Sequence, residues 1–123
     1  MLVEDSPDIL DTMSEFLCIH AFDVLAIAHP FDALQQAASF NADVYVLDIG
    51  LPGMDGYHLV QQLRQLDTNN ARFIALTGYG QRSDKARALM AGFDVHFTKP
   101  VNTQVLLGTL HAAASMGLSS KNY

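Results

Sequence analysis

The chain has 123 residues, of which 50% are hydrophobic, and it contains no apolar run long enough to span a membrane and no signal-peptide pattern. Thirteen acidic residues against seven basic ones give a net charge of −6, which argues against direct nucleic acid binding. Cys18 is the only cysteine, so the sequence excludes a disulfide framework, and we expect a cytoplasmic protein without membrane contact.

The first part of the chain alternates short apolar runs with segments of helical spacing. Ser6 is placed to cap a helix, and Pro7 suits its first turn. Apolar residues then recur at helical spacing from Ile9 to Leu17. The elements predicted in this part are strands at residues 1–3 and 24–28, a helix from Pro7 to about residue 20, and a helix from about residue 31 to residue 40.

The stretch from residue 44 to residue 57 carries the strongest signal. Four β-prone apolar residues without polar alternation predict a strand buried on both faces, as in a parallel sheet, and this strand ends at Asp48. Pro52-Gly53 predicts a turn, and Asp55 is placed to cap a helix that begins near Gly56. Asp48 is therefore expected at the carboxyl end of an interior strand, where open α/β sheets carry their chemistry.

The second half continues the alternation. Residues 73–76 predict a fourth buried strand that ends at Thr77, and Lys99-Pro100 closes a shorter fifth strand. The remaining predictions are a helix from about residue 81 to Gly92, the short strand at residues 95–97, and a last helix capped by Asn102 or Thr103. We place one domain at residues 1–114 and a frayed C-terminal tail at residues 115–123.

Five strands that alternate with five helices predict an α/β fold, a doubly wound parallel sheet with helices on both faces and right-handed crossovers. The common five-stranded order is 2-1-3-4-5, the flavodoxin-like arrangement, whose switch point lies between strands one and three. The loops that diverge there carry Glu4, Asp5 and Asp48. The sequence therefore predicts three carboxylates in one cleft.

Three crowded carboxylates repel one another unless a hard cation neutralises them, and Mg²⁺ suits such a site. Thr77 and Lys99 end strands four and five at the same edge, so a hydroxyl and an ammonium are expected beside the cation. Together these groups can neutralise phosphoryl oxygens, and an aspartate can carry the phosphoryl group as an acyl phosphate. Each of these five residues alone also has a structural explanation, such as a strand end or a surface lysine. That all five occur by chance at the same edge of the sheet is improbable.

The chain resembles the receiver domain of response regulators in two-component signalling. The resemblance extends from Val3-Glu4-Asp5 through residues 47–57 and Ala75-Leu76-Thr77-Gly78 to Lys99-Pro100. It implies a signalling phosphoacceptor rather than a separate enzyme, one that catalyses its own phosphorylation and dephosphorylation. The phosphoryl group would come from a sensor histidine kinase or a histidine phosphotransfer domain, and a downstream output domain or protein would receive the signal.

The resemblance also implies a role for each site residue. Asp48 accepts the phosphoryl group, while Asp5, Asp48 and the carbonyl of Gly50 bind Mg²⁺ and Glu4 acts mainly through water. Thr77 and Lys99 contact the phosphoryl group, and the Lys99–Pro100 peptide bond is cis. Thr77 and residue 96 form the switch that reshapes the face made by the fourth helix, fifth strand and fifth helix.

Two features depart from the family pattern. The usual switch aromatic, three residues before the lysine, is His96 here. The run before Glu4 is shorter than the family's usual first strand, so we expect a truncated N-terminus. Residues 91–101 resemble receivers attached to hybrid kinases, so we expect a piece of a larger protein such as a hybrid sensor kinase, although a stand-alone regulator also fits.

Three other functions compete with phosphate acceptance. An aspartyl-phosphate phosphatase needs a second acid two residues after the nucleophile, where this chain has Gly50. A flavin-binding domain needs a hydroxyl-rich phosphate loop after the first strand, where Glu4-Asp5 would repel phosphate. An inert receiver-like module that only binds partners is disfavoured because every chemical position is filled.

Overall fold

The computed structural model describes residues 1–50, 54–78 and 85–121. The described elements alternate along the chain as the sequence predicts. They are β1 (Leu2–Val3), α1 (Pro7–Ile19), β2 (Ala26–Ile27), α2 (Pro30–Phe40), β3 (Val44–Asp48), α3 (Gly56–Leu66), β4 (Arg72–Thr77), α4 (Lys85–Ala91), β5 (Val95–Thr98) and α5 (Thr103–Lys121). All neighbouring strands pair in parallel in the order β2-β1-β3-β4-β5, which confirms the predicted fold class.

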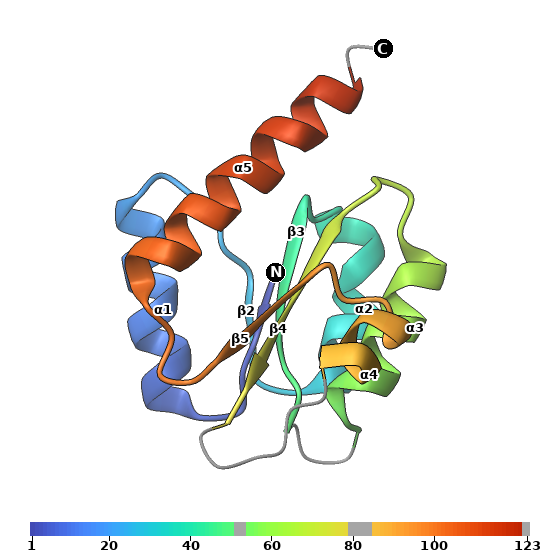
Figure 1. The fold of residues 1–123 in the computed structure, drawn as a ribbon, viewed down its shortest axis with the longest axis horizontal. Helices are drawn as coiled ribbons and strands as arrows, with labels where there is room; N and C mark the ends of the chain where they lie inside the picture. The colour runs from blue at the N-terminus through green and yellow to red at the C-terminus, as the bar shows by residue number, and fades with distance from the viewer. Residues whose placement is uncertain (51–53, 79–84, 122–123) are drawn as a thin grey trace.

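The sheet lies between two helical layers. Figure 1 shows α1 and α5 over one face of the sheet and α2, α3 and α4 over the other. Side chains alternate between the layers, so Tyr45 and Leu47 of β3 join the cluster under α2–α4 while Val46 joins the cluster under α1 and α5. Because the strands are buried on both faces, they appear in the sequence as continuous apolar runs.

Strand register aligns the ends of the central strands. Val3 is level with Leu47, so Glu4 follows β1 at the height of Asp48 on β3. Asp48 is in turn level with Leu76, one residue before Thr77. The parallel register thus brings acidic residues from two separate loops to one edge of the sheet.

Arg64 fastens α3 to the turn between α4 and β5. Its Nε donates a hydrogen bond of 2.5 Å to the carbonyl of Gly92, and its Nη2 lies 3.0 Å from Oδ2 of Asp94. The guanidinium also lies 4.6 Å from the centroid of the Phe73 ring on β4. Gly92, which has a φ of 123°, ends α4 as the sequence predicts.

Several local predictions were wrong. The Ser6 side chain makes no capping hydrogen bond although Ser6 is the N-cap residue of α1. Helix α5 continues to Lys121, through most of the predicted tail. The predicted turn at residues 52–53 and the helix start near residue 81 lie outside the described residues.

Among the described helices, none combines the length and the apolar character needed to cross a bilayer.

Candidate functional site at the carboxyl edge of the sheet

Glu4, Asp5 and Asp48 meet at the carboxyl edge of the sheet, as the sequence predicts. Each contributes a carboxylate oxygen to a group in which all these atoms lie within 4.8 Å of one another. Glu4 is 1% exposed and Asp48 is 6% exposed, whereas Asp5 is exposed. The cleft therefore has two buried carboxylates at its base and one facing solvent.

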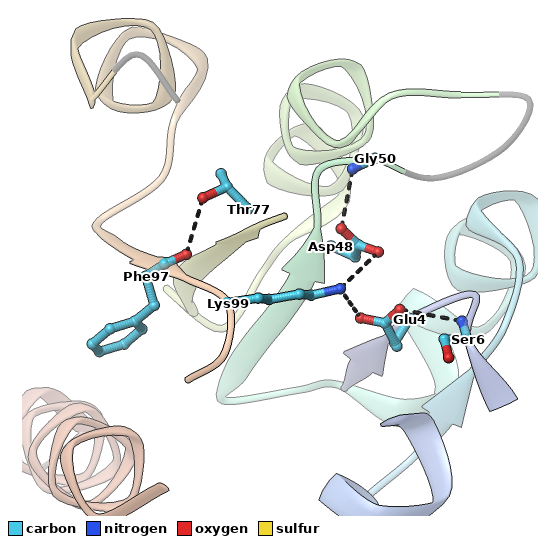
Figure 2. A network of polar contacts seen from close by, with 7 residues as sticks. All are labelled: Glu4, Ser6, Asp48, Gly50, Thr77, Phe97 and Lys99. Atoms are coloured by element: carbon cyan, nitrogen blue, oxygen red, sulfur yellow. Dashed lines mark hydrogen bonds and ion pairs between the residues drawn. The ribbon is translucent and has the colours of Figure 1, made fainter. Parts of the chain in front are cut away.

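Lys99 inserts its ammonium between the two buried carboxylates. Its Nζ lies 2.6 Å from Oε2 of Glu4 and 3.2 Å from Oδ2 of Asp48, as Figure 2 shows. The lysine reaches this position from the end of β5, and the Lys99–Pro100 peptide bond after it is cis, as the resemblance implies. The ammonium thus partly neutralises the carboxylates from the side of β5.

The electrostatics of the pair follow from burial and mutual attraction. Burial raises the pKa of Glu4, and the charge of the neighbouring Asp48 raises it further. Hydrogen bonds from Lys99 and from the amide of Ser6 lower this pKa, but the net effect is an increase. Burial alone would lower the pKa of Lys99, but hydrogen bonds and Coulomb attraction from Glu4 and Asp48 outweigh it and raise that pKa. Lys99 is accordingly a fixed positive charge at neutral pH.

Backbone amides hold the two buried carboxylates in place. The amide of Gly50 donates to Oδ1 of Asp48 at 3.1 Å, and the amide of Ser6 donates to Oε1 of Glu4 at 3.2 Å (Figure 2). The sequence singled out Ser6 for its side chain, but its amide is the group that contacts the site. No sequence signal distinguishes this role, because any residue except proline supplies the same donor.

Thr77 lies at the same edge but its hydroxyl is engaged elsewhere. The side chain is buried, and Oγ1 donates to the carbonyl of Phe97 at 3.3 Å. Figure 2 shows this hydroxyl turned toward β5 rather than toward Asp48. The structure therefore brings Thr77 next to the cleft without placing its hydroxyl in it.

His96 lies on the α4 side of β5. It is half-buried and pairs in register with Ala75 of β4. It borders a hollow of about 180 Å³ whose lining residues are Ala88, Leu89, Phe93, Asp94, Val95 and His96. His96 thus lies on β5, three residues before Lys99, and faces a hollow that helix α4 also lines.

The donor set fits the cation that the sequence predicts. Three carboxylates present only hard oxygen ligands, which Mg²⁺ prefers over nitrogen or sulfur. Asp5 is exposed to solvent, and Mg²⁺ at such a site typically keeps several waters and accepts phosphoryl oxygens.

The sequence and the fold of this chain are similar to those of known proteins. The sequence profile of the response regulator receiver domain matches residues 1–111. The transcriptional regulatory protein KdpE of Mycobacterium tuberculosis is 35% identical over 113 residues, which cover 92% of this chain and 49% of KdpE. Protein PilH of Pseudomonas aeruginosa is 30% identical over 113 residues, which cover 91% of this chain and 93% of PilH.

A solved structure shares the whole fold. The receiver domain protein (CheY-like) from Methanospirillum hungatei superimposes with a TM-score of 0.88 at 26% identity, over 97% of this chain and 94% of that one. The chain spans about half the length of KdpE and most of the length of PilH, so its relatives include both longer regulators and proteins of its own size.

Proposed function

Because the chain belongs to the response regulator receiver domain family of two-component signalling, we propose that Asp48 accepts a phosphoryl group from a phosphohistidine. The observation that carries this proposal is the cleft itself. A buried aspartate lies within hydrogen-bond distance of a lysine ammonium and within 4.8 Å of two further carboxylates. The donor would be a sensor histidine kinase or a histidine phosphotransfer domain.

The transfer needs one bond to form and one to break. An Oδ atom of Asp48 attacks the phosphorus while the P–N bond to the donor imidazole breaks, and the ring nitrogen keeps that electron pair. The product is an acyl phosphate on Asp48. Lys99, already 3.2 Å from this carboxylate, is placed to neutralise a phosphoryl oxygen as the group arrives.

Glu4, Asp5, Asp48 and the carbonyl of Gly50 would hold Mg²⁺, with Glu4 acting mainly through water. When bound, the ion supplies positive charge to the phosphoryl oxygens that the lysine alone cannot fully neutralise. Without a cation the same carboxylates repel one another. This repulsion lowers the stability of the folded chain, so the cluster is better explained by metal binding than by a structural role.

Thr77 and His96 would relay the change. For the Thr77 hydroxyl to contact a phosphoryl group, it must leave the carbonyl of Phe97 on β5. His96, the residue before Phe97 on β5, borders the hollow that α4 also lines. A change at Thr77 would therefore reach the face made by α4, β5 and α5, where a downstream output domain or protein would read it in the cytoplasm.

Acetyl phosphate, a small-molecule phosphoryl donor, tests the proposal. With Mg²⁺ the wild-type chain should gain one phosphoryl group that hydroxylamine removes, as expected for an acyl phosphate. Asp48→Asn should gain none. Unchanged labelling in Asp48→Asn, or labelling that resists hydroxylamine, would exclude Asp48 as the acceptor.

A further inference from the structure

The start of α3 packs unusually close to the backbone that carries Asp48. A Cβ atom added to Gly56 would lie 2.6 Å from the Cα of Ile49 and 2.9 Å from the carbonyl oxygen of Asp48. Real Cβ atoms essentially never approach backbone atoms so closely, so a side chain at this position requires the backbone to shift. Only glycine at position 56 allows α3 to pack this closely against the backbone of Asp48 and Ile49 without a backbone shift.

Hydrogen bonds close this contact from both sides. The amide of Gly56 donates to the carbonyl of Ile49 at 2.8 Å, and the amide of Ile49 donates to the carbonyl of Leu76 on β4 at 2.9 Å. Asp55 fixes the helix start, because its Oδ1 accepts a hydrogen bond of 2.8 Å from the amide of His58. Ile49 is therefore held between β4 and the first residue of α3.

The same segment positions the carboxylate. Gly50 directly follows Ile49, and its amide donates to Oδ1 of Asp48. The direction of that N–H depends on the peptide plane after Ile49, which the hydrogen bond from the Gly56 amide to the Ile49 carbonyl fixes. Since β4 holds Ile49 from the other side, a methyl group at position 56 must displace either α3 or the backbone at Asp48 and Ile49. Either shift disturbs the hydrogen bond that sets the Ile49–Gly50 peptide plane.

We propose that Gly56 is a positioning residue for Asp48: its missing side chain lets α3 hold the Ile49–Gly50 peptide so that the Gly50 amide orients the acceptor carboxylate. The inference rests on the proposed phosphoryl acceptance by Asp48. The Asp55-Gly56 pair marks a helix start in the sequence, and only the structure reveals the close approach.

Gly56→Ala tests the inference, with two other glycines as controls. Gly108→Ala adds a methyl group on α5 where, apart from the adjacent residues and the local helix backbone, no atom lies within 4 Å. Gly92→Ala adds strain at a positive φ of 123°, beside Arg64 and away from the cleft. The first controls for any glycine-to-alanine change in a helix, and the second for a loss of stability.

Two readouts are compared at an osmolyte concentration that keeps all four proteins folded by circular dichroism. One is the rate of Asp48 phosphorylation by saturating acetyl phosphate and Mg²⁺. The other is the proton chemical shift of the Gly50 amide without metal or donor. Gly56→Ala should slow phosphorylation at least tenfold and shift the Gly50 resonance upfield, whereas both controls should stay within twofold of the wild-type rate and leave that resonance unchanged.

Three outcomes would overturn the inference. These are a Gly56→Ala rate within twofold of wild type, an equal slowing in Gly92→Ala, and a Gly56→Ala chain that stays unfolded at every osmolyte concentration. The last result would assign the glycine to folding rather than to positioning. Failure of the proposed function is distinguishable, because it would appear as labelling that persists in Asp48→Asn.

Discussion

Tyr45 shows how a single residue of this fold can respond to pH. Its ring is buried and stacks on Phe73 with centroids 4.7 Å apart. Burial raises the pKa of the phenol, and the charge of Asp67 raises it further. A raised pKa in the folded state means that the folded chain retains this proton at a pH at which the unfolded chain has lost it. The associated stability is complete below the usual tyrosine value of about 10 and is lost as pH rises through the folded value.

Tyr45→Phe should therefore flatten the alkaline loss of stability. At pH 7 the variant should unfold at nearly the same urea concentration as wild type, because the ring and its stacking remain. Between about pH 9.5 and pH 11 the free energy of unfolding should fall less in the variant than in wild type. An equal fall in both proteins would show that the Tyr45 phenol does not titrate differently on folding.

At the residue scale, the sequence predicts positions better than orientations. The positions of Asp48, Thr77 and Lys99 at one edge were predicted because Asp48 and Thr77 end apolar strands and Lys99 directly follows β5, and the parallel register brings these strand ends together. The direction of the Thr77 hydroxyl could not be predicted, because it depends on a carbonyl of β5, the strand paired with β4. The roles of the Ser6 amide and of Gly56 likewise depend on contacts between segments, which a single sequence does not display.

Helix caps are the clearest test at the scale of elements. Asn102 precedes α5, and its Oδ1 accepts hydrogen bonds from the amides of Gln104 at 3.0 Å and Val105 at 3.2 Å. Ser6 precedes α1 at the equivalent position but makes no such bond. Asn102→Ala should lower the free energy of unfolding by about 1 kcal/mol, and Ser6→Ala by less than about half of that. Urea denaturation of the two variants checks the difference, and equal losses would mean that the Asn102 bonds add nothing.

The elements themselves follow from the sequence wherever a strong breaker or an apolar period marks them. Strands β3 and β4 were predicted within a residue or so because both are continuous apolar runs. The end of α5 was not predicted. Ser115 and Gly117 are poor helix formers in isolation, yet α5 continues past them to Lys121. Between Asn102 and Thr103, the hydrogen bonds identify Asn102 as the cap.

At the scale of the whole molecule, metal binding should appear as stability. The three carboxylates repel one another across a cleft that belongs to the folded state, so a cation bound there stabilises the entire domain. Mg²⁺ at about a hundred times its dissociation constant should stabilise the fold by roughly 2.7 kcal/mol. For a domain of this size that is a rise in Tm of roughly 10 °C, measurable by calorimetry.

Asp5→Asn is the matched control for that prediction. It removes the exposed carboxylate, so it should raise the Tm of the metal-free protein and remove most of the Mg²⁺ response. A lower metal-free Tm together with an unchanged Mg²⁺ response would mean that Asp5 neither repels its neighbours nor binds the ion.

The overall topology was predictable because alternation of strands and helices leaves few arrangements, and the observed order β2-β1-β3-β4-β5 is the common one. The assignment of residues to the two core clusters was less predictable. Each strand contributes to both, and which helix covers which residue depends on the handedness of the crossovers and on packing.

The contacts of Arg64 with Gly92 and Asp94 restrain one end of α4, so this helix has a fixed end and an end that can move about it. Arg64 holds the C-terminal end of this seven-residue helix to α3, so a displacement of α4 that keeps the Arg64 contacts is a swing about Gly92 rather than a slide along the sheet. The helix is roughly 10 Å long, so a swing of roughly 10° would carry its far end about 2 Å while its near end hardly moves. In such a swing the first turn of α4 would travel farthest, and the contact that would have to give is that of the Arg87 guanidinium, which lies 4.2 Å from the centroid of the Tyr57 ring on α3.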